Sequence, residues 1–243
     1  MQVGFIGSGN MAAALARGWG DPVLCSDSGS GRAQALVDEL GGEALPNAEV
    51  FARADLVILA HKPRQLHAVA SAVGDTDKIV VTILGGATIA DVQAAYPSAT
   101  VFQVEPNTPV QVRKGVLVFA ASEHPQAAAV KALFARVGVV VEVPERLTAV
   151  AGAVSGVGPA YWSLFAEAWM DAAIRHGMPE AQAATLVTET MAGTAALLTQ
   201  TDTLALRRGV TSPGGSTARG LAALERGGVR TALAAAMDDV MGS

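Results

Sequence analysis

The chain has little charge, few aromatic residues and almost no cysteine. Charged residues make up 16% of its 243 positions and aromatic residues 5%, whereas hydrophobic residues make up 51%. Soluble domains carry about 25% charged residues on average. A chain so poor in charge exposes apolar surface that must be covered, and permanent subunit interfaces resemble a protein core. The composition therefore favours an obligate oligomer.

The scarce residue types also exclude several classes of protein. With one cysteine, Cys25, no disulfide framework can form within the chain, and its apolar neighbours predict a buried thiol. No cluster of Cys, His and Asp has the spacing of metal ligands, so we predict no metal site. The net charge of −5 argues against a nucleic-acid partner, which needs a basic patch.

A secretory leader and a membrane span are not expected either. Met1 leads directly into an apolar run without a basic region before it, which predicts a cytoplasmic protein. Residues 147–166 carry no charge and are long enough to cross a membrane. A cluster of three glycines and a proline at 152–159, followed by Glu167, predicts a buried loop and helix instead.

Short apolar runs alternate with helical patterns in the first part of the chain. This alternation is typical of βαβ units around a parallel sheet whose two faces are both covered. The expected strands are Val3–Ile6, Val23–Ser26, Leu56–Ala60, Ile79–Ile83, Thr100–Val104, Gly115–Ala120 and Val139–Val143. The expected helices between them are Met11–Trp19, Arg32–Leu40, Arg64–Val73, Ile89–Ala95 and Pro125–Val137.

The rest of the chain is predicted to be helical. The expected helices are Ala160–His176, Pro179–Gln200, Asp202–Arg208, Thr217–Arg226 and Val229–Met241. We therefore predict an α/β fold with an N-terminal Rossmann-type, doubly wound sheet over residues 1–146 and an all-helical dimerisation and substrate domain over 147–243. The helix Pro179–Gln200 is apolar on nearly all sides, so a second subunit is expected to help cover it.

A glycine-rich loop follows the first strand. Gly7-Ser8-Gly9-Asn10-Met11-Ala12 fits the pattern G-x-G-x-x-A at a strand-to-helix turn. In this pattern the first glycine makes the turn, the second lets the backbone approach a pyrophosphate, and the small last residue packs the helix against the strand. The phosphates then meet free N–H groups at the helix N-terminus. The loop predicts a nicotinamide dinucleotide site.

The end of the second strand is expected to contact the ribose of the cofactor. An acidic residue here favours the 2′-hydroxyl of NAD, whereas a nearby arginine suits the 2′-phosphate of NADP. Asp27, Ser28 and Arg32 supply both types, and Asp27 has the alternative of capping the next helix. The choice between NADH and NADPH therefore stays open.

Five further segments resemble the pyrroline-5-carboxylate reductase family. They are Gly4–Met11, Asp55–Pro63 with its His-Lys-Pro end, the turn Pro106-Asn107-Thr108-Pro109, Ser155-Gly156-Val157-Gly158-Pro159-Ala160-Tyr161, and Val210-Thr211-Ser212-Pro213-Gly214-Gly215-Ser216-Thr217. The motifs occur in the family's order and span nearly the whole chain. The resemblance implies NAD(P)H-dependent reduction of a cyclic imine acid to proline by a homodimer, often assembled into a larger ring, with active sites between subunits.

The resemblance also implies roles for individual residues. The cofactor is expected at Gly7, Ser8, Gly9, Asn10, Met11, Asp27, Ser28, Arg32, Asn47, Ala60, His61, Lys62, Pro63, Ile83, Leu84 and Gly85. The substrate carboxylate is expected at Ser212, Gly215, Ser216 and Thr217, with Val157 nearby and the Thr217 hydroxyl beside the imine nitrogen as the catalytic group. A glycine-containing loop that opens a helix suits an anion because backbone N–H groups converge there. The other interpretation of this loop is an ordinary capping turn.

Four positions depart from the family pattern: His61, Gln103, Glu105 and Val157. They raise the alternative of an imine reductase with another substrate, because one pocket contact can change selectivity strongly. His61 could donate a proton, contact the cofactor or simply be a neutral histidine at a strand end. Glu105 is expected to pair with a cation such as Arg113 or Lys114.

Two other functions fit the sequence less well than this reductase. A hydroxyacid dehydrogenase of similar architecture would need a lysine on the interdomain helix, but Ala160–His176 contains none and Lys131 is the last lysine of the chain. A non-catalytic nucleotide-binding regulator is disfavoured by the intact Ser212–Thr217 loop, although ligand binding without turnover would support it.

Overall fold

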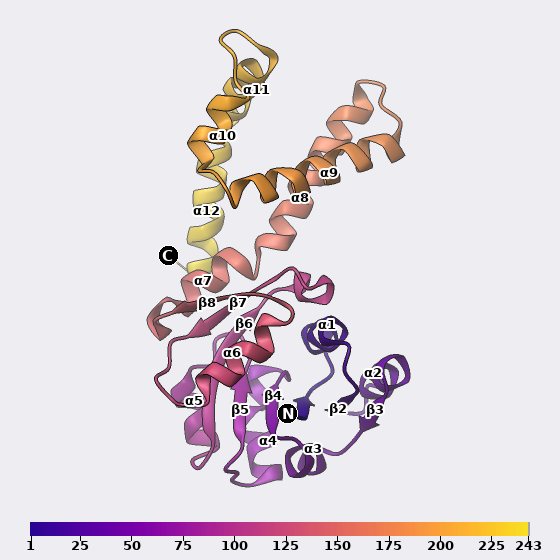
Figure 1. Cartoon of the computed structure of the whole chain (residues 1–243), viewed down its shortest axis with the longest axis vertical. Helices are drawn as coiled ribbons and strands as arrows, with labels where there is room; N and C mark the ends of the chain where they lie inside the picture. Colours follow the sequence, from indigo (N-terminus) through magenta and orange to yellow (C-terminus); the bar gives the residue numbers. More distant parts are fainter. Residues whose placement is uncertain (243) are drawn as a thin grey trace. The chain divides into compact units, whose positions relative to one another are not determined.

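The computed structural model describes residues 1–242. The chain divides into two compact units, residues 1–159 and the residues from Ala160 onward. The first unit holds all the strands, and the second contains only helices among its described residues (Figure 1). This is the predicted fold class: a Rossmann-type sheet followed by an all-helical domain.

The sheet of the first unit has eight strands in the order β3-β2-β1-β4-β5-β6-β7-β8. Their bounds are β1 Val3–Ile6, β2 Val23–Ser26, β3 Gly42–Ala44, β4 Leu56–Leu59, β5 Ile79–Thr82, β6 Thr100–Pro106, β7 Gly115–Ala120 and β8 Gly138–Val143. All neighbours are parallel except β6 and β7. The strand order reverses beside β1, where doubly wound folds bind their ligands.

Helices cover both faces of the sheet. They are α1 Asn10–Trp19, α2 Arg32–Leu40, α3 Asn47–Arg53, α4 Leu66–Val73, α5 Ile89–Ala95, α6 Ala127–Ala135 and α7 Thr148–Ser155, with short 3-10 turns η1 Pro63–Gln65, η2 Thr108–Val112 and η3 Glu145–Leu147. Alternate strand residues enter two separate cores. Phe5 packs with Trp19 and Phe134 of α1 and α6, whereas its neighbour Ile6 lies in the core with Tyr96 beside α5.

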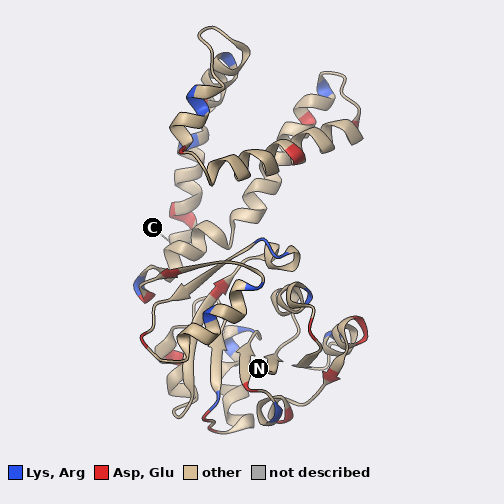
Figure 2. Cartoon of the chain, viewed as in Figure 1, with Lys and Arg blue, Asp and Glu red and all other residues tan. Residues whose placement is uncertain are grey.

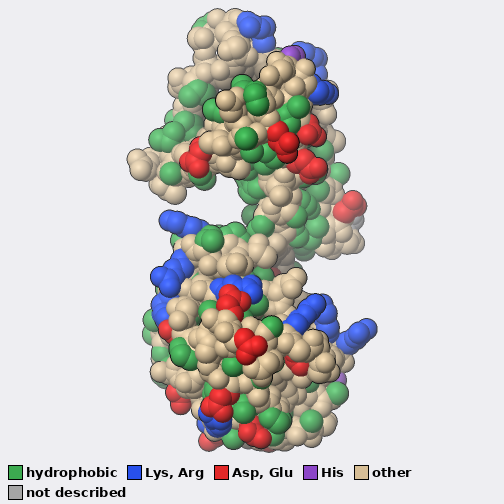
Figure 3. Space-filling model, turned by 90° about the vertical axis from the view of Figure 1, so that its right-hand side faces the viewer, with side chains coloured by type: hydrophobic (Ala, Val, Ile, Leu, Met, Phe, Trp, Pro, Cys, Tyr) green, Lys and Arg blue, Asp and Glu red, His purple; other side chains and the backbone are tan. Residues whose placement is uncertain are grey.

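The second unit contains α8 Gly158–Arg175, which begins just before it, and then α9 Glu180–Leu198, α10 Thr203–Gly209, α11 Ser216–Arg226 and α12 Val229–Met241. Its described residues form little core, since Ala183 and Val187 are its buried hydrophobic side chains. Trp162 and Trp169 are 63% and 56% exposed. Figure 3 shows hydrophobic side chains on the surface of this unit. A second subunit is therefore needed to cover it, as the composition predicts.

The uncharged stretch at residues 147–166 forms α7 and the first part of α8 (Figure 2). The segment Glu145–Arg175 is long and apolar enough to cross a membrane, but a core helix passes the same test. The segment was expected to be buried, but within one chain only 11% of its most apolar part is buried. A second subunit rather than this chain would therefore cover the apolar side chains of this segment.

The expected boundary after residue 146 stays a prediction. The first compact unit extends to Pro159 because α7 packs on β6 and β7. Sequence periodicity predicted the long strands and the helices α1, α2 and α5 closely, but it missed β3, α3 and α7 as elements. Cys25 is fully buried beneath α2, as expected.

Candidate active site

The glycine-rich loop is fixed between the ends of β1 and its two neighbours. The Gly7 N–H and the Ser8 hydroxyl both donate to the Ser26 carbonyl oxygen, at 3.1 and 2.9 Å. Gly7 has φ of +99°, and a Cβ there would lie 2.8 Å from the His61 backbone nitrogen. Only glycine therefore fits this turn.

The loop leaves the N-terminus of α1 open for an anion. Gly9 precedes the helix in an extended conformation, and no side chain of the described residues caps it. The backbone N–H groups of the first turn are thus available at the positive end of the helix. A Cβ at Gly9 would meet nothing within 4 Å, so the backbone here is open to a ligand.

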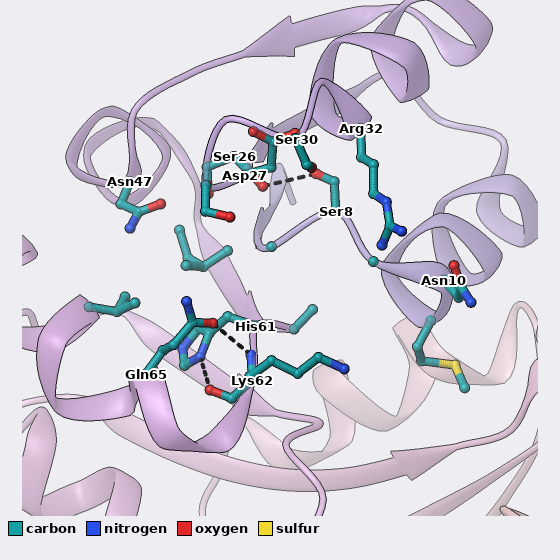
Figure 4. Close-up of a pocket in the computed structure, with 17 residues that line it drawn as sticks. Ser8, Asn10, Ser26, Asp27, Ser30, Arg32, Asn47, His61, Lys62 and Gln65 are labelled. Carbon is teal, nitrogen blue, oxygen red and sulfur yellow. Dashed lines mark hydrogen bonds between the residues drawn. The ribbon is translucent and has the colours of Figure 1, made fainter.

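A cavity of about 460 Å³ lies in front of this loop. Twelve of the predicted cofactor residues line it: Gly7, Ser8, Gly9, Asn10, Met11, Asp27, Ser28, Arg32, Asn47, Ala60, His61 and Lys62. They come from the carboxyl ends of β1, β2 and β4 and from the starts of α1, α2 and α3 (Figure 4). The volume and the open helix end fit a bound dinucleotide.

Four of the predicted cofactor residues, Pro63, Ile83, Leu84 and Gly85, do not line this cavity. Leu84 is only 4% exposed and belongs to the core on the α4 and α5 face of the sheet. Their contact with a cofactor stays a prediction. Five other residues line the cavity although no sequence motif predicted them: Ile6, Ser26, Ser30, Gln65 and Val69.

Asp27 is tied into the turn after β2. Its Oδ1 accepts the Gly29 N–H at 2.7 Å, and its Oδ2 accepts the Ser30 hydroxyl and the Ala33 N–H, both at 2.9 Å. These bonds, above all the one from Ala33, lower the pKa of Asp27 to about 2. The capping role that the sequence left open is therefore present, and the carboxylate still lines the cavity.

His61 and Lys62 form a rigid turn after β4. The Lys62 N–H donates to the Gln65 side-chain oxygen at 3.1 Å, and His61 Nδ1 lies 2.9 Å from the Lys62 carbonyl oxygen. A carbonyl oxygen can only accept, so Nδ1 carries the proton and Nε2 is an acceptor. Nε2 is buried without a partner among the described residues, and burial lowers the pKa of His61. The ring is thus a neutral imidazole at neutral pH.

The Pro-Asn-Thr-Pro turn has a structural role within the first unit. The buried Asn107 side chain donates to the Ser155 carbonyl oxygen at 3.0 Å and accepts the Val116 N–H at 2.8 Å. It therefore joins β6, β7 and the end of α7. Val157 follows directly, half-buried in the turn between α7 and α8.

The expectation that Glu105 pairs with a cation is wrong. Its Oε1 accepts a long hydrogen bond from the Gln103 amide at 3.4 Å, while Arg113 donates to the Gly18 carbonyl oxygen. Burial raises the pKa of Glu105. The Gln103 amide oxygen is buried without a partner in the described part of the chain. Glu105 lies against Gly152 of α7 instead of pairing with Arg113 or Lys114, which follow η2.

The predicted substrate loop lies in the second unit, between α10 and α11. Gly214 has φ of +69°, and its carbonyl oxygen accepts a bond from Arg219 at 2.8 Å. The Ser212 hydroxyl lies against Gly215, where a Cβ would overlap it. Among the described residues no side chain caps α11, so its first N–H groups are open for an anion. The interpretation as an ordinary side-chain cap loses its support.

Two family models match the chain. Residues 2–86 match the family described as NADP oxidoreductase, coenzyme F420-dependent, which covers the nucleotide half. Residues 145–242 match the family described as pyrroline-5-carboxylate reductase dimerisation. The two matches correspond to the cavity-bearing sheet and to the apolar helices.

Similar proteins cover the full chain. A pyrroline-5-carboxylate reductase of Synechocystis is 36% identical over 96% of this chain and 93% of its own length. Pyrroline-5-carboxylate reductase 3 of Mus musculus is 34% identical over 98% and 92%. Crystal structures of the Streptococcus pyogenes enzyme and of the Plasmodium falciparum enzyme with NADP bound give TM-scores of 0.88 and 0.87, each at 25% identity. They cover 100% and 99% of this chain and 97% and 95% of their own. The chain belongs to the pyrroline-5-carboxylate reductase family.

Proposed function

We propose that this protein reduces 1-pyrroline-5-carboxylate to L-proline with NADPH or NADH, as an enzyme of proline biosynthesis. The observation that carries this proposal is the similarity over nearly the whole length to enzymes of that name, at 36% identity. The open glycine-rich loop and the open N-terminus of α11 supply the two anion sites that such a reaction needs. One would hold the cofactor and the other the substrate.

The nucleotide cavity supports the cofactor assignment. The first turn of α1 would hold the pyrophosphate, and Lys62 adds positive charge at the rim of the same cavity. When bound, the nicotinamide supplies the hydride, so the protein mainly orients the reactants. Pro63, Ile83, Leu84 and Gly85 remain proposed contacts of the nicotinamide half, although they lie outside the cavity.

The Ser212–Thr217 loop supports the substrate assignment. The Ser212 hydroxyl and the N–H groups of Gly215, Ser216 and Thr217 would hold the carboxylate. The half-buried Thr217 hydroxyl would accept or donate a hydrogen bond at the imine nitrogen as it becomes an amine. Val157 would border the substrate. A protonated imine accepts hydride readily, so no histidine or carboxylate is required for this step.

A second candidate is reduction of a different cyclic imine. The observation that favours it is the contact between the buried Gln103 and the half-buried Glu105, because the Gln103 amide oxygen has no partner among the described residues. An unpaired buried acceptor near the substrate would select a donor group that the five-membered imine acid lacks. A non-catalytic regulator remains the alternative if nucleotide binds without turnover.

The assembly is proposed to be a homodimer that builds a larger ring in the cytoplasm. The exposed apolar side chains of α8 and α9 support the dimer, because Leu164 and Leu186 are 65% and 55% exposed in a single chain. Sedimentation of the purified protein tests the size: a mass of one chain would contradict the dimer, and a mass of two chains would contradict the ring.

Variants of the substrate loop test the proposed function. Ser212→Ala is expected to raise KM for the imine acid at least tenfold, and Thr217→Ala to lower kcat at least tenfold, about 1.4 kcal/mol of transition-state stabilisation each. Thr199→Ala, whose hydroxyl bonds within its own helix, is the matched control and should leave both constants unchanged. Unchanged kcat/KM in both loop variants would remove these residues from the site.

A further inference from the structure

We propose that Asp27 makes this enzyme discriminate against the cofactor's 2′-phosphate, so that it binds NADH more tightly than NADPH. The inference rests on the proposed function, because it concerns the same nucleotide cavity. Asp27 follows β2 directly and lines that cavity with the glycine-rich loop. In βαβ dinucleotide folds, the residue at this place faces the 2′-position of the adenosine ribose.

The Asp27 carboxylate is held in place by its own turn. Three donors, the Gly29 N–H, the Ser30 hydroxyl and the Ala33 N–H, lie within 2.7–2.9 Å of its oxygens. A ribose hydroxyl that enters the cavity can also donate to this carboxylate, whereas an ionised phosphate can only accept. Swinging the side chain away from a phosphate would break all three bonds.

Charge makes this carboxylate selective. Because its pKa is about 2, Asp27 is ionised at any pH at which the enzyme works. A 2′-phosphate carries close to two negative charges near neutral pH. Like charges within a few ångströms at the edge of a protein repel by kilocalories per mole. A free 2′-hydroxyl meets no such repulsion.

Arg32 is the cation that could offset Asp27. It lines the same cavity, but it also lines a second hollow with Gly9 and Asn10 at the start of α1. In Figure 4 the Arg32 side chain extends toward Asn10, whereas Asp27 lies beside Ser30. This position suits the pyrophosphate, which NADH and NADPH share. Arg32 therefore strengthens the binding of both cofactors, and Asp27 determines which of them binds more tightly.

Nucleotide binding in the absence of imine acid tests the inference. The dissociation constants of NADH and NADPH are measured by the fluorescence of the reduced nicotinamide, and those of ADP-ribose and its 2′-phosphate by calorimetry. For the wild-type protein we expect each 2′-phosphorylated ligand to bind at least tenfold more weakly than its partner, about 1.4 kcal/mol. Equal or tighter binding of the phosphorylated ligands would overturn the inference.

Two variants separate the roles of charge and fold. Asp27→Asn keeps one acceptor oxygen but removes the charge. It should lower the ratio of the NADPH dissociation constant to the NADH dissociation constant at least fivefold. If Asp27→Asn proves unstable, Asp27→Ser also removes the charge and should lower the same ratio. Arg32→Ala should weaken both cofactors by a similar factor and leave the ratio unchanged. A ratio that Asp27→Asn and Asp27→Ser leave unaltered would overturn the inference, whereas absence of any nucleotide binding in the wild-type protein would refute the proposed function itself.

Discussion

The carboxylate of Glu105 occupies the space in which a side chain at Gly152 would begin. A Cβ added to Gly152 would overlap Glu105 Oε2, so a side chain at residue 152 would force this carboxylate to move. The glycine lies in the middle of a helix, where it costs about 1 kcal/mol relative to alanine. This contact links one of the positions that depart from the family pattern, Glu105, to a glycine in the uncharged segment.

Gly152→Ala is expected to force the Glu105 carboxylate to move, and the cost of that movement should offset the gain of about 1 kcal/mol in helix propensity. Urea unfolding followed by circular dichroism measures the change. The matched control is the same substitution in a Glu105→Ala background, where the space is free. There the cost should shrink by at least about 1 kcal/mol, and strictly additive effects would show that the two residues do not interact.

Asn107→Ala is expected to cost about 1–3 kcal/mol, since the Ser155 carbonyl oxygen and the Val116 N–H both lose their partner in a buried place. Thr108→Ala, at the exposed next position of the same turn, should change stability by less than about 0.5 kcal/mol. Equal effects of the two substitutions on the unfolding midpoint would show that the asparagine is not a structural link.

The sequence predicted the parts of the fold that periodicity encodes. Runs such as Leu56–Leu59 are apolar throughout because both faces of the sheet are covered. β3 is three residues, Gly42–Ala44, and two of them are exposed, so it has no apolar pattern to detect. Likewise α7 contains Gly152, a residue that weakens a helical pattern. The glycine lies against Glu105 of β6, a contact between residues far apart in the sequence.

The sequence predicted those parts of the candidate site that a local motif encodes. The glycine-rich loop predicted Gly7 and Gly9 because their backbone geometry is a local property. Residues such as Gln65 and Val69 line the cavity only because η1 and α4 fold against the end of β4. The engagement of Asp27 depends on where its turn places three donors, which spacing alone does not determine.

Asp27 should make stability depend on acidity in a defined window. Its pKa is about 2 in the folded protein and near 3.8 when unfolded. A lowered carboxyl pKa adds stability that is present above the unfolded value and is lost as the pH falls toward 2. Asp27→Asn should therefore lose less stability between pH 4 and pH 2 than the wild-type protein. Parallel losses in urea unfolding at the two pH values would contradict the hydrogen-bonded carboxylate.

His61 is expected to titrate below 6.5, because burial disfavours its charged form. A histidine with a lowered pKa adds stability above the unfolded value and loses it as the pH falls through 6.5. Proton–nitrogen correlation spectra should show the proton on Nδ1 at pH 7. A midpoint for His61 at or above 6.5, or a proton on Nε2, would contradict the buried acceptor.

The proposed reaction of this chain is the transfer of a hydride to the imine of 1-pyrroline-5-carboxylate. The most direct test is the oxidation of NADH and NADPH by the purified protein, followed by absorbance, with the imine acid as substrate and proline quantified as the product. We expect one proline for each cofactor oxidised, with faster turnover at low NADH than at low NADPH. Tight cofactor binding without proline formation would contradict the proposed reaction and would point to Gln103 and Glu105 as determinants of another substrate.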